Sequence, residues 1–135
     1  KCKITNLNIK VLLHFVKDLS LKEVRDLYCS ADIVVIPSLY EGFGFAIGEA
    51  MACKVPVITT TGGAIPEVIE DCGIMVPPAN SEALEKAILE LIPDEKLKNS
   101  LSEKGFRRII EHLQWKKVAD LMTESYQKEI NKMLS

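Results

Sequence analysis

Short runs of β-branched and aliphatic residues recur along the first half of the chain. They occupy residues 11–15, 33–36, 57–60 and 74–76, and none of them alternates with polar residues. Runs of this length and composition are typical of strands that are buried on both faces of a parallel sheet. We therefore expect four buried strands.

Helical patterns separate these runs. Ser20 followed by Glu23 forms a capping box, which predicts a helix over residues 21–29. A second helix is expected over residues 45–53, and Pro66 suits the start of a short helical turn. Strands that alternate with helices predict an α/β fold with a doubly wound parallel sheet.

The chain becomes purely helical after Pro78. One apolar stripe predicts a helix that begins after Asn80 or Ser81 and stops at Pro93. The stripe consists of Ala83, Leu84, Ala87, Ile88, Leu91 and Ile92. Residues 97–110 predict a second C-terminal helix and residues 115–126 a third, and we expect their apolar residues to serve as core or docking surface.

Size and charge limit the possible functions. A chain of 135 residues suits one compact domain. The net charge of −2 provides no basic face for a nucleic acid and no polybasic membrane tether. The sequence has neither an apolar stretch of about 20 residues nor the apolar core of a signal peptide. We expect a cytoplasmic protein without a nucleic-acid partner.

The cysteines give no sign of a metal site. Cys2, Cys29, Cys53 and Cys72 are far apart in sequence, and only two histidines accompany them. Such a pattern lacks the spacing of metal ligands. We expect reduced, mostly buried thiols and no bound metal.

Candidate chemistry concentrates where six of the seven glycines lie, between residues 42 and 73. Residues 37–52 follow a predicted strand and open a predicted helix, which places them at the carboxyl edge of the sheet, where ligands bind. The helix start offers unpaired N–H groups and a positive dipole end for a phosphate. Glu49, eight residues after Glu41, leans back toward the same edge, and carboxylates accept hydrogen bonds from vicinal sugar hydroxyls.

The residues around these glutamates resemble a known family. Glu41-x7-Glu49, within P-S-x-x-E-G-F-G-F-x-x-x-E-A-M-A, is similar to the signature of the family-4 (GT4-like) retaining glycosyltransferases with the GT-B fold. Residues 15–28 resemble the segment before that signature. Similar segments follow it at Pro56-Val57-Ile58, Gly62-Gly63, Pro66-Glu67-Val68, Gly73, Val76-Pro77, Trp115 and Tyr126. The resemblance covers most of the chain from Val11 onward.

The resemblance implies a donor site for a nucleoside-diphosphate sugar. Glu41 would be the catalytic carboxylate at the transferred sugar, and Glu49 would bind the ribose hydroxyls. The remaining donor-binding residues would be Gly42, Phe43, Gly44, Phe45, Ala46, Gly62 and Gly63, although Gly62-Gly63 also suits a plain turn. A hexose would pass, with retention of configuration, to a sugar or lipid-linked acceptor, without a metal or another cofactor.

The resemblance also implies how the domain is organised. Residues 1–135 would form a single nucleotide-sugar-binding domain, the Rossmann-like C-terminal half of a GT-B protein, incomplete at its N-terminus. The first strand and helix of that half would lie outside the chain, and so would the N-terminal domain that brings the acceptor. Any peripheral membrane association would come through that outside part.

Three departures from the family pattern bear on the chemistry. The Arg and Lys that the family places against the diphosphate would lie upstream, because Lys54 is the only basic residue between Ser38 and Ala79. Family glycines are replaced at Lys17 and Lys54. If position 54 requires a left-handed backbone, lysine costs about 1 kcal/mol relative to glycine.

Other functions remain open at this point. The chain alone could be a non-catalytic binding module or fragment, since it lacks the acceptor domain and the basic pair. A related GT-B enzyme, such as a nucleotide-sugar epimerase, would need acid and base residues that the sequence does not display. A doubly wound phosphate-binding domain unrelated to sugars is a further alternative, but no G-x-G-x-x-G follows the first expected strand.

Overall fold

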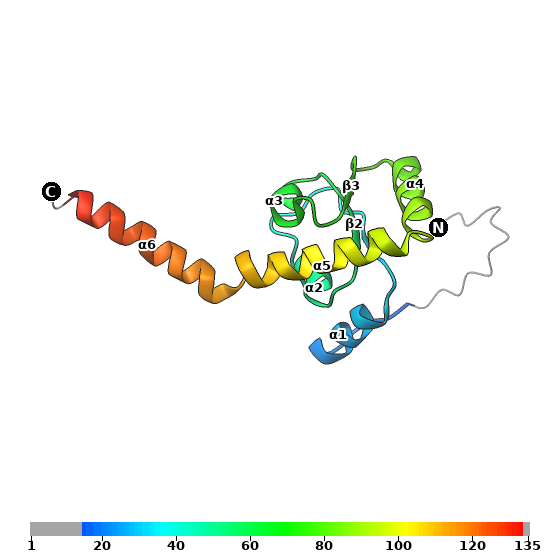
Figure 1. Ribbon diagram of the computed structural model, residues 1–135, viewed down its shortest axis with the longest axis horizontal. Coiled ribbons are helices and arrows are strands. Elements are labelled where there is room, and N and C mark those ends of the chain that lie inside the picture. The colour runs from blue at the N-terminus through cyan, green and yellow to red at the C-terminus, as the bar shows by residue number, and fades with distance from the viewer. Residues whose placement is uncertain (1–14, 134–135) are drawn as a thin grey trace.

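The computed structural model describes residues 15–133, in which three parallel strands and six helices form one α/β unit. The elements in chain order are α1 (Leu21–Ser30), β1 (Val34–Ile36), α2 (Phe45–Ala52), β2 (Val57–Thr60), α3 (Ile65–Ile69), β3 (Ile74–Val76), α4 (Ser81–Leu91), α5 (Glu95–His112) and α6 (Trp115–Met133) (Figure 1). The predicted parallel sheet is confirmed. The strand expected over residues 11–15 lies outside the described residues, apart from Phe15.

The sheet has the order β1-β2-β3, so β2 is paired on both edges. Val35 faces Ile58 across the first pair, and Ile58 faces Ile74 across the second. Every residue of β2 is buried. No described strand pairs with the outer edge of β1.

Two core clusters lie on opposite faces of the sheet, because successive strand residues point to opposite sides. The first consists of Ile47, Ala50, Met51, Val57, Ile65, Val68, Ile69 and Cys72 and is covered by α2 and α3. The second consists of Ile58, Val76, Ala87, Leu91 and Leu101 and is covered by α4 and α5. The result is a sheet with helices on both faces, as the alternating pattern predicted.

The expectation that all strands are buried on both faces was wrong for β1 and β3. All three residues of β1 are half-buried, and in β3 only Val76 is buried. Both are edge strands of the described sheet, so each is paired with β2 along one edge only. Apolar composition alone does not distinguish such an edge strand from the central one.

The helix boundaries follow the predicted caps. Ser20 accepts a hydrogen bond from the backbone N–H of Glu23, and Glu23 accepts one from the backbone N–H of Ser20, which completes the predicted capping box. Asn80, one of the two proposed caps, begins α4 by accepting from the N–H of Ala83. Such a cap stabilises a helix by about 1 kcal/mol.

The last helix, α6, extends away from the body of the molecule (Figure 1). None of its described residues is buried, and Trp115 and Tyr126 are largely exposed. The apolar residues of this helix are therefore not part of the core. Among residues 15–133, no helix is long and apolar enough to cross a membrane.

The loops after β1 and β2 are joined at the carboxyl edge of the sheet. Glu41 and Gly63 form an isolated parallel bridge, and the N–H of Ala64 donates to the carbonyl oxygen of Glu41 at 3.0 Å. The hydroxyl of Thr60 donates to the carbonyl oxygen of Ser38. These contacts extend the β1–β2 pairing beyond the strands and fix the loop that carries Glu41.

We predict that Gly63→Ala lowers the free energy of unfolding by at least about 2 kcal/mol. Gly63 has φ 68°, and a Cβ there would overlap the carbonyl oxygen of Glu41. Gly42→Ala is the matched control, because a Cβ at Gly42 has no atom within 4 Å; its effect should stay within about 0.5 kcal/mol. Urea unfolding measures both, and equal effects would contradict the close approach.

Lys54, which stands where the family has a glycine, occupies a left-handed position with φ 58°. Its ammonium contacts Glu103 at 3.0 Å and lies 4.5 Å from the centre of the Phe106 ring. The ion pair is exposed and contributes little, whereas the ring contact contributes about 0.5–1 kcal/mol. These contacts offset much of the backbone strain.

We predict that Lys54→Gly leaves the free energy of unfolding close to that of the parent, because relief of strain offsets the lost contacts. Lys54→Ala loses the same contacts and keeps the strain, so it should be less stable than Lys54→Gly by about 1 kcal/mol. Chemical unfolding of the two variants measures this difference directly. An alanine variant as stable as the glycine variant would show that the left-handed backbone carries no cost.

Candidate functional site

The start of α2 is open at the carboxyl edge of the sheet. Gly44 is its N-cap with φ 85°, a left-handed conformation that favours glycine, and no side chain caps this end of the helix. The N–H groups of Ile47 and Gly48 donate to the carbonyl oxygen of Gly44. The first N–H groups of α2 and the positive end of its dipole therefore face the loop, an arrangement that suits an anion.

Glu41 is held in the loop just before this helix. Its carboxylate oxygen Oε1 accepts a hydrogen bond from the Ser38 hydroxyl at 2.8 Å, and the residue is half-buried. Its backbone is fixed by the bridge to Gly63. Among the described residues, no protein group donates to the second carboxylate oxygen, so Glu41 retains capacity to accept a further hydrogen bond.

Glu49 lies in the second turn of α2 and is exposed. The hydroxyl of Tyr28, on α1, donates to its oxygen Oε2 at 3.4 Å. Burial raises the pKa of Tyr28, and the Glu49 carboxylate raises this pKa further. The hydroxyl therefore stays protonated near neutral pH and remains available as a donor to Glu49.

A largely apolar groove of about 280 Å³ runs along α2 beside Glu49. Its lining residues are Phe43, Phe45, Gly48, Glu49, Ala52, Val68, Ile109, Leu113, Trp115 and Val118. The rings of Phe43 and Phe45 lie 4.7 Å apart between centroids, at an angle of 42°. α2, α3, α5 and α6 thus meet around one carboxylate.

The predicted site residues form two groups in the structure. Phe43, Phe45 and Glu49 line the groove together. Glu41 contacts the Gly62–Gly63 turn instead, and a Cβ on either glycine would overlap backbone of the loop at residues 39–41. Gly42 lies in the loop before α2, Gly44 is the N-cap of this helix, and Ala46 is in its first turn. Contact of these residues with a donor stays a prediction.

Several residues that shape this region were given no site role from the sequence. Ser38 lies within the quoted motif but was given no role, although it holds the carboxylate of Glu41. Tyr28 lies within the resembling segment, where nothing indicated that its hydroxyl reaches α2. Ile109 and Trp115 come from distant C-terminal helices, and only the tertiary fold brings them to the groove.

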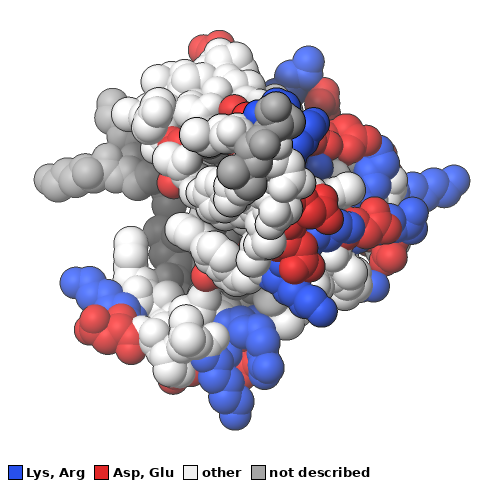
Figure 2. Space-filling view, turned by 90° about the vertical axis from the view of Figure 1, so that its left-hand side faces the viewer, with Lys and Arg blue, Asp and Glu red and all other residues white. Residues whose placement is uncertain are grey.

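The segment that carries the candidate site is poor in basic residues. Lys54, the sole basic residue between Ser38 and Ala79, follows the opposite end of the helix and contacts Glu103. Figure 2 shows basic and acidic side chains intermixed over the right-hand and lower parts of the view, without an extended basic area on this face. In the described part of the chain, no three His, Cys, Asp or Glu residues cluster closely enough to hold a metal ion.

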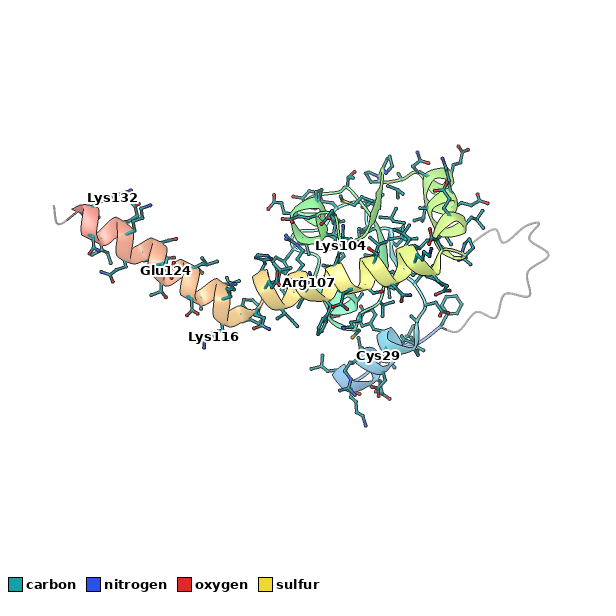
Figure 3. All side chains as sticks on the ribbon, in the orientation of Figure 1. Cys29, Lys104, Arg107, Lys116, Glu124 and Lys132 are labelled. Carbon is teal, nitrogen blue, oxygen red and sulfur yellow. The ribbon has the colours of Figure 1, made fainter. Side chains whose placement is uncertain are left out.

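A second hollow, of about 430 Å³, lies between α5 and the loop before β3. It is bordered by both signs of charge, and Lys104 and Arg108 are paired there with Asp71 and Glu70. Figure 3 shows Lys104 on α5, on the body of the molecule. None of the predicted donor-binding residues borders this hollow, so we place the candidate site at the start of α2.

The chain is similar to known proteins over most of its length. The family described as Glycosyl transferases group 1 matches residues 1–108. The chain is 35% identical over 130 residues to the MMP alpha-(1->4)-mannosyltransferase of Mycolicibacterium hassiacum, covering 94% of this chain and 32% of that protein. It therefore spans about a third of the length of this relative.

Two solved structures share the fold. Sucrose-phosphate synthase from Thermosynechococcus elongatus has a TM-score of 0.77 and 30% identity, covering 88% of this chain and 30% of that one. The C-terminal domain of a glycosyl transferase group 1 family protein (LpcC) from Francisella tularensis has a TM-score of 0.66 and 35% identity, covering 76% of this chain and 53% of that one. The chain thus belongs to the group 1 glycosyl transferases, as a C-terminal domain of the GT-B type.

Proposed function

We propose that this domain binds the sugar donor of a retaining hexosyltransferase whose donor is a nucleoside-diphosphate sugar. The observation that carries the proposal is the open start of α2, with Glu41 before it and Glu49 in its second turn. Backbone N–H groups there suit the diphosphate, and the two carboxylates suit hydroxyls on either side of it.

Glu49 is assigned to the ribose. It lies on a helix fixed by three buried residues, Ile47, Ala50 and Met51, and its exposed carboxylate leaves room for a ligand. A rigid support of this kind favours a constant part of the ligand, and the ribose is common to all donors of one nucleotide. The Tyr28 hydroxyl orients the carboxylate from α1.

Glu41 is assigned to the transferred sugar. It lies in the loop before α2, where Ser38 donates to one oxygen of its carboxylate and no other protein group of the described chain donates to the second oxygen. A half-buried carboxylate is also suited to stabilise positive charge that develops at the sugar in the transition state. The N–H groups from Gly42 to Ala46 would stabilise the leaving diphosphate.

Binding of the acceptor is assigned to a second domain. The chain spans only 32% of the mannosyltransferase that it resembles and 30% of the sucrose-phosphate synthase chain. We propose that a second domain brings a sugar or lipid-linked acceptor to the carboxyl edge of the sheet. Transfer in this scheme requires neither a metal nor another cofactor.

A second candidate function is donor binding without catalysis. The scarcity of basic residues between Ser38 and Ala79 favours it for the chain alone, because a diphosphate carries at least two negative charges. Assaying sugar transfer by the 135-residue chain and by a protein that joins it to an acceptor domain distinguishes the two functions.

We predict that Glu49→Ala, in a protein that pairs this domain with its acceptor domain, weakens binding of both the nucleoside diphosphate and the sugar nucleotide. Loss of hydrogen bonds to a charged group costs about 1.5–3 kcal/mol, or roughly ten- to a hundredfold in affinity. Calorimetry measures both affinities. Glu85→Ala is the matched control, because Glu85 is an exposed glutamate on α4, and it should leave both affinities unchanged.

We predict that Glu41→Gln leaves nucleoside-diphosphate affinity nearly unchanged and lowers the rate of sugar transfer. Glutamine retains an acceptor for the Ser38 hydroxyl, so the loop should keep its shape. Nucleotide calorimetry and a transfer assay on the same sample test this. If Glu41→Gln abolishes nucleotide binding while Glu49→Ala does not, the two roles are assigned wrongly.

We predict that the 135-residue chain binds nucleoside diphosphates with a Kd weaker than micromolar. Each charge-assisted hydrogen bond that a basic side chain would supply is worth roughly 1.5–3 kcal/mol, and here helix-end N–H groups act without one. Calorimetry with UDP, GDP and ADP tests this, and micromolar binding by the chain alone would contradict it.

A further inference from the structure

Two of the cysteines contact each other where α1 packs against α2. Cys29 is in the last turn of α1, where Figure 3 labels it, and Cys53 directly follows α2. Their thiols are in hydrogen-bonding contact. The expectation of mostly buried cysteines was wrong here, since Cys29 is exposed and Cys53 half-buried; only Cys72 is buried among the three described.

A second contact fixes the same helix pair. Tyr28 precedes Cys29 and donates to Glu49, which lies one helical turn before Cys53. Residues four apart on a helix share a face, so Glu49 and Cys53 face α1 together. Two independent side-chain pairs therefore hold α1 and α2 in one register.

The exposure of the two thiols gives an order of reaction. The two thiols differ in exposure, since Cys29 is exposed and Cys53 is half-buried. Burial, followed by the contact with Cys29, raises the pKa of Cys53, so less of it is present as the reactive thiolate. The exposed Cys29 is thus suited to attack first and the half-buried Cys53 to attack second.

We propose that Cys29 and Cys53 form a reversible disulfide by exchange with a low-molecular-weight disulfide. The Cys29 thiolate attacks one sulfur of that disulfide, breaks its S–S bond and releases one thiolate. The Cys53 thiolate then attacks Cys29 in the mixed disulfide and releases the second thiolate. The protein loses two protons and two electrons, and the small disulfide is reduced to two thiols.

The bond would act on a weakly held helix. None of the described residues of α1 is buried, so few apolar contacts hold this helix to the body. A disulfide would close a chain segment that contains β1 and the loop with Glu41, and would keep the Tyr28 hydroxyl at Glu49. This inference concerns the thiols alone and does not depend on the proposed sugar transfer.

The test is equilibration of the full chain with reduced and oxidised glutathione, followed by acid quenching, alkylation and peptide mapping without reduction. We expect a Cys29–Cys53 linked peptide whose formation is favoured on the order of a hundredfold over that in urea-unfolded protein. Cys29→Ser and Cys53→Ser should each abolish it. Cys72→Ser and Cys2→Ser are matched controls and should leave it unchanged.

Thermal unfolding of the unmutated protein provides a measurement that is independent of the variants. The oxidised form should unfold at a Tm higher by on the order of 10 °C, and dithiothreitol should reverse the shift. Glutathione adducts on single cysteines without the linked peptide would overturn the proposal. So would equal linkage in folded and urea-unfolded protein, or an oxidised form with a Tm no higher than the reduced one.

Discussion

Parallel pairing on both edges of β2 determines where the rest of the site lies. Parallel strands end at the same edge, so the loops after β1 and β2 meet there. The Glu41–Gly63 bridge continues the pairing past the strand ends. The Thr60 hydroxyl, donating to the Ser38 carbonyl, adds a link from the buried strand itself. The position of the Glu41 backbone is thus a consequence of sheet register, and the start of α2 follows from it.

Local sequence was sufficient to predict the elements of the described chain and their order. Capping residues such as Ser20 and Asn80 act within one helical turn, so their effect can be recognised without the tertiary fold. Burial was less predictable, because it depends on which strand lies in the middle. The β1 and β2 runs have similar composition, yet only β2 is fully buried.

The candidate site was predictable to the extent that it is contiguous in sequence. Residues 41–49 lie on one loop and one helix, and the family motif identified them together. Other residues reach the same region from elsewhere in the sequence. Ser38 contacts Glu41, which is 3 residues away, and Tyr28 contacts Glu49, which is 21 residues away. Trp115 lines the groove beside Glu49 from a still more distant position. Such contacts depend on how α1, α5 and α6 pack against α2, which no local pattern specifies. The contact between the Cys29 and Cys53 thiols was missed for the same reason.

Rigidity is distributed unevenly around the candidate site. All buried residues of the described chain lie between Gly44 and Gly105, so α1 and α6 lie outside the core. Elements with few buried contacts open at lower free energy than the core. Glu49 lies at the boundary, since its backbone belongs to the buried helix α2 and its hydrogen-bond donor to the loosely held helix α1. The position of this carboxylate is therefore set by the core, whereas its orientation depends on whether α1 is docked.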